Sequence, residues 1–270
     1  MAHLSGGPRS LRSSAEPDRG KVGTVSDTKQ PKQAVRERVW ATLEASGFVE
    51  PGVTGYIPAF TGAQQAADRL ASLDVWRGAR VVKAGPDRAQ QPVRVLALEA
   101  GKLLYMAAPR LAQRLPFYLL DPGTLTVPAI EAGDRTVAAR VATAVDTQDM
   151  RPVDLVVCGS VAVNTSGARL GKGAGYSDIE IALLAEAGLI SERTTIATSV
   201  HDSQVLDEDL PEREHDFRVD LIVTPTQVVW CSGPRRRPAR VLWHELTAEQ
   251  IDAMPALKAR WPSRPRRSQR

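Results

Sequence analysis

A glycine-rich stretch between two apolar segments is the feature of this sequence that most constrains its fold. Residues 167–180 read Gly-Ala-Arg-Leu-Gly-Lys-Gly-Ala-Gly-Tyr-Ser-Asp-Ile-Glu, with glycines at 171, 173 and 175. A valine-rich run at 153–163 precedes the stretch, and apolar residues at helical spacing follow it at 179–189. This pattern predicts a buried strand, then a glycine loop, then a helix.

The glycine loop has the composition of an anion-binding site. Glycine permits a positive φ and a close approach of the backbone to a ligand. The N-terminus of a helix directs free N–H groups at an anion, and Arg169 and Lys172 add positive charge. The pattern therefore predicts a phosphate chain as the ligand, although a tight turn with solvated basic side chains fits the same glycines.

Two common phosphate-binding motifs do not fit this loop. The dinucleotide-binding fingerprint requires glycine at its sixth position, which is Tyr176 when the count starts at Gly171. The P-loop requires a glycine five residues before the Gly-Lys pair and a hydroxyl after it, and Ser166 and Gly173 occupy those positions.

Three ordered motifs instead resemble those of the 5-formyltetrahydrofolate cyclo-ligase (methenyltetrahydrofolate synthetase) family. The segment 169–178 is similar to the family's glycine signature, Lys-Gln-Ala-Val-Arg at 32–36 to its N-terminal motif, and residues 210–225 to its C-terminal segment. The resemblance spans roughly residues 31–230. The run at 153–163 and the Asp-Ile-Glu at 178–180 resemble more closely the branch called methenyltetrahydrofolate synthetase domain-containing proteins.

Alternating strands and helices predict an α/β fold with a mostly parallel sheet that is covered on both faces. The resemblance implies a three-layer α/β/α sandwich of the NagB/ribose-5-phosphate-isomerase/CoA-transferase type. We expect residues 31–255 to form this domain, between a disordered tail at 1–30 and a basic tail at 256–270. The strand at 153–160 is expected to deliver the glycine loop to the ligand-binding edge of the sheet.

Local sequence patterns also predict the remaining helices and strands. We expect helices at 32–46 and after Gly62, strands at 56–60 and 80–83, and a hairpin of strands at 93–98 and 103–106. A Pro-rich connection is expected at 109–135, and residues 138–145 fit no single assignment. Further strands are predicted at 195–200, 219–223 and 228–230, and a capped last helix runs from Thr247 to before Pro255.

The resemblance also implies the roles of the site residues in binding ATP and Mg²⁺. The cations would be Lys32, Arg36, Arg169 and Lys172, of which Arg169 and Lys172 would act in catalysis. The loop would add the ATP-binding residues Leu170, Gly171, Gly173, Gly175 and Tyr176. Asp178 and Asp216 would hold the metal. Other interpretations stay open. Lys32 and Arg36 also fit a solvated helix face, Asp178 a carboxylate favoured at a helix N-terminus, and Asp216 a loop residue before a strand. His215 is interpreted as structural, and His201 is left unassigned.

The positions that the resemblance assigns to folate binding depart from the family pattern. Ser177 replaces a second aromatic residue, Gly159-Ser160 and Val163-Asn164 replace Pro-Gly and Phe-Asp, and residues 60–65 lack an acid. Two functions therefore compete. One is an ATP- and magnesium-dependent cyclo-ligase of one-carbon metabolism that forms 5,10-methenyltetrahydrofolate, ADP and phosphate. The other is a non-catalytic or altered-substrate nucleotide-binding relative that acts as a binding module, with RNA considered as a partner.

Charge and composition limit the partners. Lys and Arg number 35 and Asp and Glu 31, but six of the basic residues lie at 258–270, which has no acid. The body is therefore slightly acidic, and only the tail, with Arg235-Arg236-Arg237, suggests weak association with nucleic acid. Two cysteines exclude a disulfide framework, and without a long apolar run or a signal segment we expect no membrane association and a cytoplasmic location.

Overall fold

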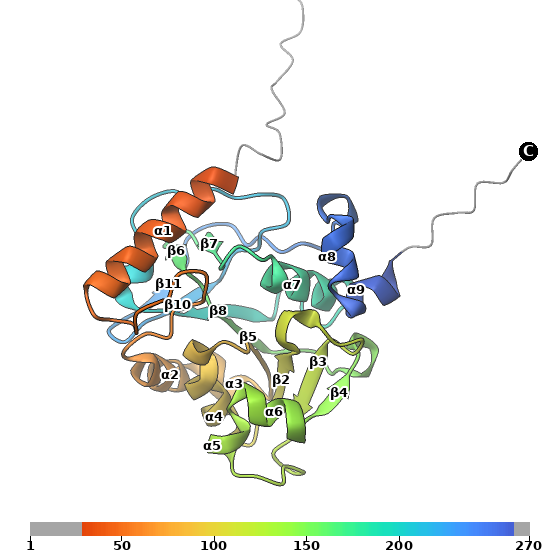
Figure 1. Ribbon diagram of the computed structural model, residues 1–270. Coiled ribbons are helices and arrows are strands. Elements are labelled where there is room, and N and C mark those ends of the chain that lie inside the picture. The colour runs from red at the N-terminus through yellow and green to blue at the C-terminus, as the bar shows by residue number, and fades with distance from the viewer. Residues whose placement is uncertain (1–28, 262–270) are drawn as a thin grey trace, which may run out of the picture.

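The computed structural model describes residues 29–261 and has an eight-stranded sheet at its centre (Figure 1). The strand order is β11-β10-β8-β5-β1-β2-β3-β4. The strands are β1 (Val81–Ala84), β2 (Leu103–Ala107), β3 (Phe117–Leu120), β4 (Thr143–Val145), β5 (Leu155–Cys158), β8 (Thr195–Ser199), β10 (Leu221–Val223) and β11 (Val228–Trp230). The five central strands from β10 to β2 are parallel, and the outer pairs are antiparallel. The predicted α/β fold with a mostly parallel sheet is confirmed.

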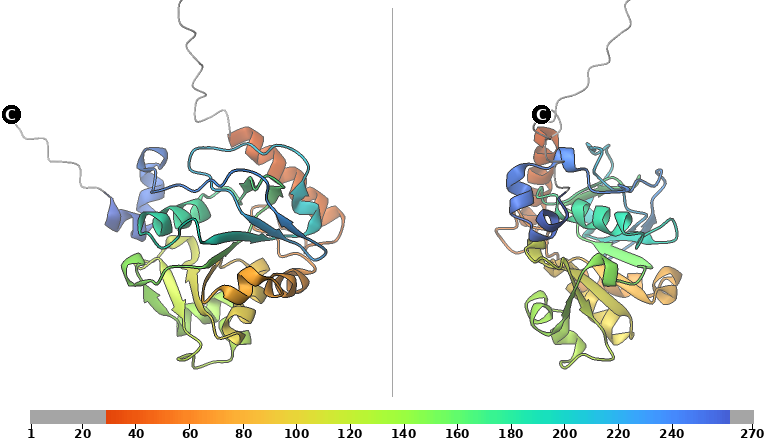
Figure 2. Two further views of the ribbon diagram at one scale, coloured as in Figure 1. Left: turned by 180° about the vertical axis from the view of Figure 1, so that it is seen from behind. Right: turned by 90° about the vertical axis from the view of Figure 1, so that its right-hand side faces the viewer.

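Helices cover both faces of the sheet, as Figure 2 shows from two further sides. One face carries α2 (Ala63–Ala71), α3 (Asp74–Gly78), α4 (Gln91–Glu99), α5 (Ala129–Ala132) and α6 (Arg135–Val141); the other carries α7 (Tyr176–Glu186), α8 (Ala248–Asp252) and α9 (Pro255–Arg260). Short 3-10 turns lie at Arg88–Gln90, Pro109–Leu111, Thr147–Asp149, Asp202–Gln204 and Trp243–Glu245. No helix among residues 29–261 has the length and apolar character that a membrane crossing requires.

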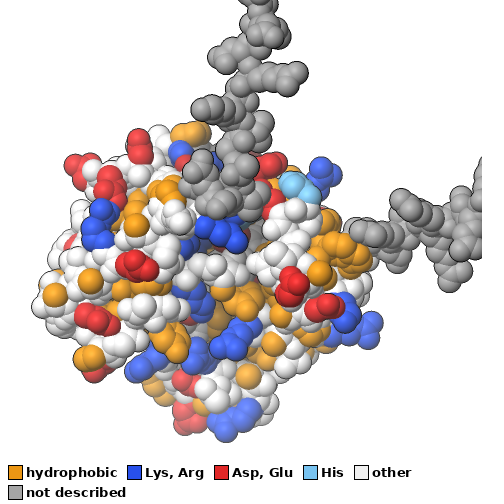
Figure 3. Space-filling view, turned by 45° about the horizontal axis from the view of Figure 1, so that its top comes forward, with side chains coloured by type: hydrophobic (Ala, Val, Ile, Leu, Met, Phe, Trp, Pro, Cys, Tyr) orange, Lys and Arg blue, Asp and Glu red, His pale blue; other side chains and the backbone are white. Residues whose placement is uncertain are grey.

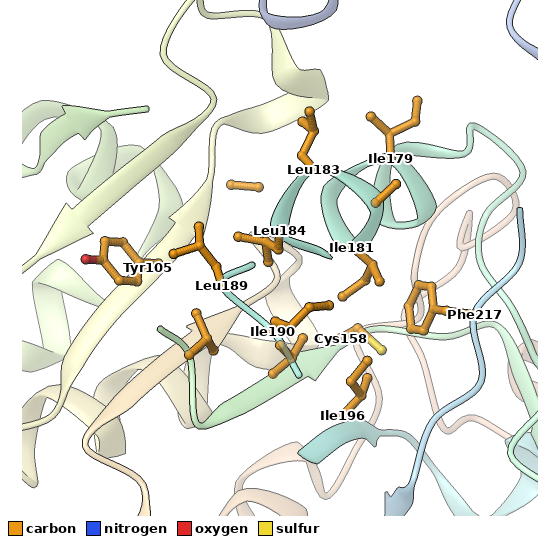
Figure 4. Packing of buried hydrophobic residues seen from close by; sticks show 14 of the residues in the cluster. Tyr105, Cys158, Ile179, Ile181, Leu183, Leu184, Leu189, Ile190, Ile196 and Phe217 are labelled. Carbon is orange, nitrogen blue, oxygen red and sulfur yellow. The ribbon is translucent and has the colours of Figure 1, made fainter. Parts of the chain in front are cut away.

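The strands are buried on both sides, so successive residues enter different cores. Val156 packs in the core beneath α7, whereas its neighbour Val157 packs in the core beneath α2 and α4. Figure 4 shows the first of these cores, where Ile181 and Leu184 of α7 point toward the sheet. This explains why the central strands read as continuous apolar runs and not as alternating ones.

A second, smaller layer lies beyond the carboxyl end of β5. Helix α1 (Lys29–Ala45) packs on a three-stranded sheet of β6 (Ala162–Asn164), β7 (Arg169–Leu170) and β9 (Val205–Leu206), through Val39, Trp40 and Leu43. The antiparallel pair β6–β7 separates β5 from the glycine loop. The predicted order of buried strand, glycine loop and helix therefore lacked one unit, because the β6–β7 hairpin stands between the strand and the loop.

Other local predictions are corrected. Residues 93–98 belong to helix α4, because Pro92 starts a helix and a short apolar run does not distinguish a helix from a strand. Residues 56–60 contribute only one bridge, between Phe60 and Val49. The expected connection at 109–135 contains β3 and α5, and residues 138–145 divide between α6 and β4.

Residue 256, where the basic tail was expected to begin, lies in a helix. Residues 255–260 form α9, in which Ala256 and Leu257 are fully buried. Arg260 pairs with Asp146, and Lys258 with Asp252 at 2.9 Å. At the other end α1 begins at Lys29, so the expected tails fall mostly at residues 1–28 and 262–270, which lie outside the described part of the chain.

Candidate functional site

A cleft of about 540 Å³ opens between α1, the 171–175 loop and the loop at 213–216. We call it the main cleft. Lys and Arg side chains gather on this face of the molecule, with hydrophobic side chains beside them (Figure 3). Every site residue predicted from the sequence lines the main cleft: Lys32, Arg36, Arg169, Leu170, Gly171, Lys172, Gly173, Gly175, Tyr176, Asp178 and Asp216. Motifs that are far apart in the sequence therefore form one site.

The loop requires glycine at two of its three positions. Gly173 has a φ of 104° and Gly175 a φ of 74°, a backbone conformation that other residues rarely adopt. Gly175 is also the N-cap of α7, whose N-terminus faces the cleft. The carbonyl oxygen of Gly171 accepts a hydrogen bond from Arg36 Nε at 2.6 Å. The first turn of α7 and the loop thus present backbone to the main cleft, as an anion site requires.

Arg169 is a fixed cation in the wall of the main cleft. Its guanidinium donates to Ser160 Oγ at 3.3 Å and to the Gly159 carbonyl at 3.4 Å, and it pairs with Asp178 at 3.3 Å. It also lies over the ring of Phe217, 4.5 Å from the centroid. Gly159-Ser160, one of the departures from the family pattern, therefore holds this arginine in place.

Two of the basic residues of α1, Lys32 and Arg36, are buried and face the site. Lys32 Nζ donates to Asp216 Oδ2, which also accepts from the backbone N–H of Arg213. Burial lowers the pKa of Arg36, against the charge of Asp216, which raises it. The interpretation of Lys32 and Arg36 as a solvated helix face is excluded, since each is less than a tenth exposed.

Asp178 and Asp216 form a pair of carboxylates in the main cleft. Burial raises the pKa of Asp178; Arg169 opposes this rise and the negative charge of Asp216 adds to it. A divalent cation would relieve both the desolvation and the repulsion between the two acids. Mg²⁺ takes one or two carboxylates together with waters and phosphate oxygens, so this donor set fits the metal that the family resemblance implies.

Several cleft residues were missed from the sequence. Asp87 pairs with Lys172 at 3.2 Å, and Glu180 pairs with Lys83 beneath the cleft. Arg110 lines the cleft with a φ of 59°, a strained conformation for a residue other than glycine. Only Asp87 had a sequence signal, because it follows the strand at 80–83 and ligands bind at the carboxyl ends of such strands.

A buried arginine on the opposite face supports the Asp87 loop. Arg94 of α4 is 1% exposed and donates to the carbonyls of Gly133, Gly85 and Asp87. Burial lowers its pKa to about 10. Arg94 thus fixes the loop that carries a cleft carboxylate.

The folate-side departures do not all reach the main cleft. Ser177 lines it, but Asn164 instead accepts from the Ala168 N–H at 3.1 Å and donates to the Glu208 carbonyl, which fixes the β6–β7 hairpin. Residues 60–65 are not among the lining residues. Of the positions that differ from the family, Ser177 is the one that changes the cleft surface.

Of the two histidines, only His215 lines the main cleft. His201 stacks on Phe48 at 4.0 Å and accepts from the Ser203 N–H, and burial lowers its pKa. His215, interpreted as structural, lines the main cleft and bonds to Glu245, with its Nε2 3.7 Å from Asp216. His215 therefore connects the cleft to the C-terminal segment.

The arginine triplet at 235–237 is already paired. Arg235 and Arg237 contact Asp220 at 2.9 and 2.6 Å, and Arg236 lies 3.8 Å from Glu212. These charges hold the segment after β11 to the body, which weakens the expectation that they attract nucleic acid.

Comparison with known proteins identifies the family of this chain. The model of the 5-formyltetrahydrofolate cyclo-ligase family matches residues 28–225. The methenyltetrahydrofolate synthase domain-containing proteins of Bos taurus and Homo sapiens are 37% and 36% identical to the chain over 235 and 236 residues. Each alignment covers 84% of this chain, which spans 61% of the length of these curated relatives.

One solved structure of similar size shares part of this sequence. The NMR structure of Aquifex aeolicus 5,10-methenyltetrahydrofolate synthetase is 21% identical with a TM-score of 0.49, and covers 76% of this chain and 94% of its own. Because the family model spans most of the chain and includes all three motifs, this chain belongs to the 5-formyltetrahydrofolate cyclo-ligase family.

Proposed function

We propose that the protein is an ATP- and Mg²⁺-dependent 5-formyltetrahydrofolate cyclo-ligase. The observation that carries this proposal is the main cleft, where four predicted cations, the glycine loop and two carboxylates converge. Such a set suits phosphoryl transfer, which requires positioning and charge neutralisation more than covalent chemistry from the protein.

In the proposed reaction the formyl oxygen of 5-formyltetrahydrofolate attacks the γ-phosphate of ATP and ADP leaves. N10 then closes onto the activated carbon, and phosphate departs to give 5,10-methenyltetrahydrofolate. Lys32, Arg36 and Lys172 would bind the phosphates, while Arg169, held rigidly by its neighbours, would neutralise charge on the transferred group. Asp178 and Asp216 would hold Mg²⁺, which supplies further charge neutralisation when bound.

The test is direct. Protein, Mg-ATP and 5-formyltetrahydrofolate are mixed, and the absorbance of the methenyl product is followed. Arg36→Met should abolish turnover, because Arg36 faces the cleft. Arg38→Met is the matched control on the same helix, since its exposed side chain pairs with Glu208 outside the cleft.

A second candidate function rests on Ser177. This residue lines the main cleft where the family pattern has an aromatic side chain that could pack on the pterin ring. Mg-ATP binding without conversion of 5-formyltetrahydrofolate would favour an altered-substrate relative that acts as a binding module. Absence of both binding and conversion would exclude the two functions together.

A further inference from the structure

A buried ion pair forms part of the wall of the main cleft. Glu180 of α7 lines the cleft although it is only 4% exposed. Its Oε2 accepts from Nζ of Lys83, a residue of β1 that is 1% exposed. Such a pair adds little stability over apolar side chains of similar volume, because both charges lose their water. A role in the site therefore explains its presence better than stability does.

The position of Glu180 on α7 separates it from the phosphate-binding loop. Tyr176 and Ser177 lie four and three residues before Glu180 and share its helix face, and all three line the main cleft. Ile179 and Ala182 lie on another face and line a second cavity. Four residues of helix place Glu180 about 6 Å farther along the axis than Tyr176. Glu180 therefore lies in the cleft beyond the helix N-terminus and its anion site.

The surroundings of the carboxylate limit what it can bind. Among residues 29–261, Lys83 is the one group that bonds it, so a ligand can use the remaining lone pairs of a group that has about four. A phosphate would be repelled by the negative charge. A second metal ion would be repelled by the Lys83 ammonium at the same carboxylate. The N–H donors of an uncharged group are the partners that remain.

The cleft around Glu180 suits a ring. Ser177, one turn before Glu180, has a small side chain, and Tyr176, Ile57 and Pro86 add aromatic and apolar surface to the same cleft. Sites for small molecules typically combine such surfaces with a few polar groups that fix orientation. The basic side chains of the cleft suit the phosphates, so a ring with N–H groups on one edge fits beside Glu180.

We propose that Glu180, held in place by Lys83, is a specificity-determining residue that accepts hydrogen bonds from the N–H edge of the second substrate's ring. This inference rests on the proposed function, under which that ring is the pterin of 5-formyltetrahydrofolate. A 2-amino-4-oxo ring carries its amino group and the neighbouring ring N–H side by side, and a carboxylate accepts from both. Residues 60–65 have no acid and do not line the cleft, so they offer this ring no carboxylate.

The test separates the ring edge from the rest of the ligand. Lys83→Met/Glu180→Leu removes both charges together, because loss of one partner would leave the other buried and unpaired. Calorimetric titrations of the full chain and of this variant use Mg-ATP, 5-formyltetrahydrofolate and its 2-desamino analogue. We expect the variant to bind 5-formyltetrahydrofolate at least about tenfold more weakly and Mg-ATP within about twofold. The analogue lacks the amino donor, so the variant should weaken it by about threefold at most.

Arg260→Met/Asp146→Asn is the matched control, because it removes another ion pair whose members line neither cavity. All three titrations should be unchanged in this control. If Lys83→Met/Glu180→Leu is unfolded by circular dichroism, Glu180→Gln replaces it, since glutamine keeps the shape of the side chain and removes the charge and one acceptor oxygen.

The outcomes are distinct. Equal weakening of 5-formyltetrahydrofolate and its 2-desamino analogue would overturn the inference, because packing and not the ring edge would then be lost. Equal weakening of Mg-ATP would also overturn it, since the pair would then support the whole site. If the full chain binds Mg-ATP but not 5-formyltetrahydrofolate, the proposed function itself is refuted, together with the inference that rests on it.

Discussion

The two walls of the site differ in their side-chain chemistry and in whether the family model matches them. The charged wall, formed by α1, the 171–175 loop and the 213–216 loop, consists of charged side chains and backbone, and it lies within the residues that the family model matches. The C-terminal wall, formed by residues 238–250 around the second cavity of about 210 Å³, lies beyond the family match and combines Val241, Leu242 and Leu246 with polar side chains such as Arg240 and Glu245. A wall of charge and backbone N–H groups suits an anion, whereas a wall that combines aliphatic and polar side chains suits a ligand with both kinds of surface.

The strongest test of the charged wall is Gly173→Val. Its φ of 104° is strained for valine, and a Cβ there would lie 3.5 Å from the guanidinium carbon of Arg36. We expect binding of both Mg-ATP and tripolyphosphate to fall below detection by calorimetric titration, with the fold retained by circular dichroism.

Gly101→Val is the control for that variant. Gly101 has a φ of 68°, open space around it and no place in either cavity, so it carries comparable backbone strain. Normal ATP binding by folded Gly173→Val would show that the loop does not hold phosphates.

Arg110→Ala should have a smaller effect on the same wall. Arg110 is exposed and lines the main cleft, so we expect about tenfold weaker Mg-ATP binding from the loss of one charge-assisted contact. Thermal stability should not fall, because alanine removes no buried contact. Arg114→Ala, an exposed arginine four residues on, should change neither quantity; equal effects of the two variants would indicate only long-range charge.

Thr247→Ala tests the C-terminal wall, which Thr247 lines. Thr247 accepts from the Gln250 N–H at 3.2 Å as the N-cap of α8. Its loss should lower the free energy of unfolding by about 1 kcal/mol and weaken ATP more than tripolyphosphate. Urea denaturation measures the first effect. Thr42→Ala serves as the control, because its exposed hydroxyl caps no helix N-terminus. Equal weakening of ATP and tripolyphosphate by Thr247→Ala would mean that the two walls do not act independently.

Removal of residues 262–270 should have the smallest effect on the site. We expect unchanged activity and a fall of at most ~3.6 in the salt slope of polyanion binding, at 0.9 for each of four arginines. Removal of residues 258–270 should destabilise the body, because Arg260 pairs with Asp146. Nucleic-acid affinity that survives the shorter deletion would contradict a role for the tail.

The sequence by itself predicted the parallel core and the glycine loop, and the family resemblance implied most of the residues that line the charged wall. Valine-rich runs identify strands buried on both faces, and the spacing of Gly173, Gly175 and Asp178 records a loop that enters a helix. These signals are local, since each depends on neighbours within one element.

Only the tertiary structure decided the rest. Residues 93–98 became a helix because burial of one face, with Pro92 at its start, overrode the strand-like composition. Three contacts join residues of different elements: Lys83 with Glu180, Arg94 with the Asp87 carbonyl, and His215 with Glu245. Their sequence separations are 97, 7 and 30 residues. The second cavity exists because the chain folds back after β11 against α7, and no pattern in residues 238–250 predicts which surface they will contact.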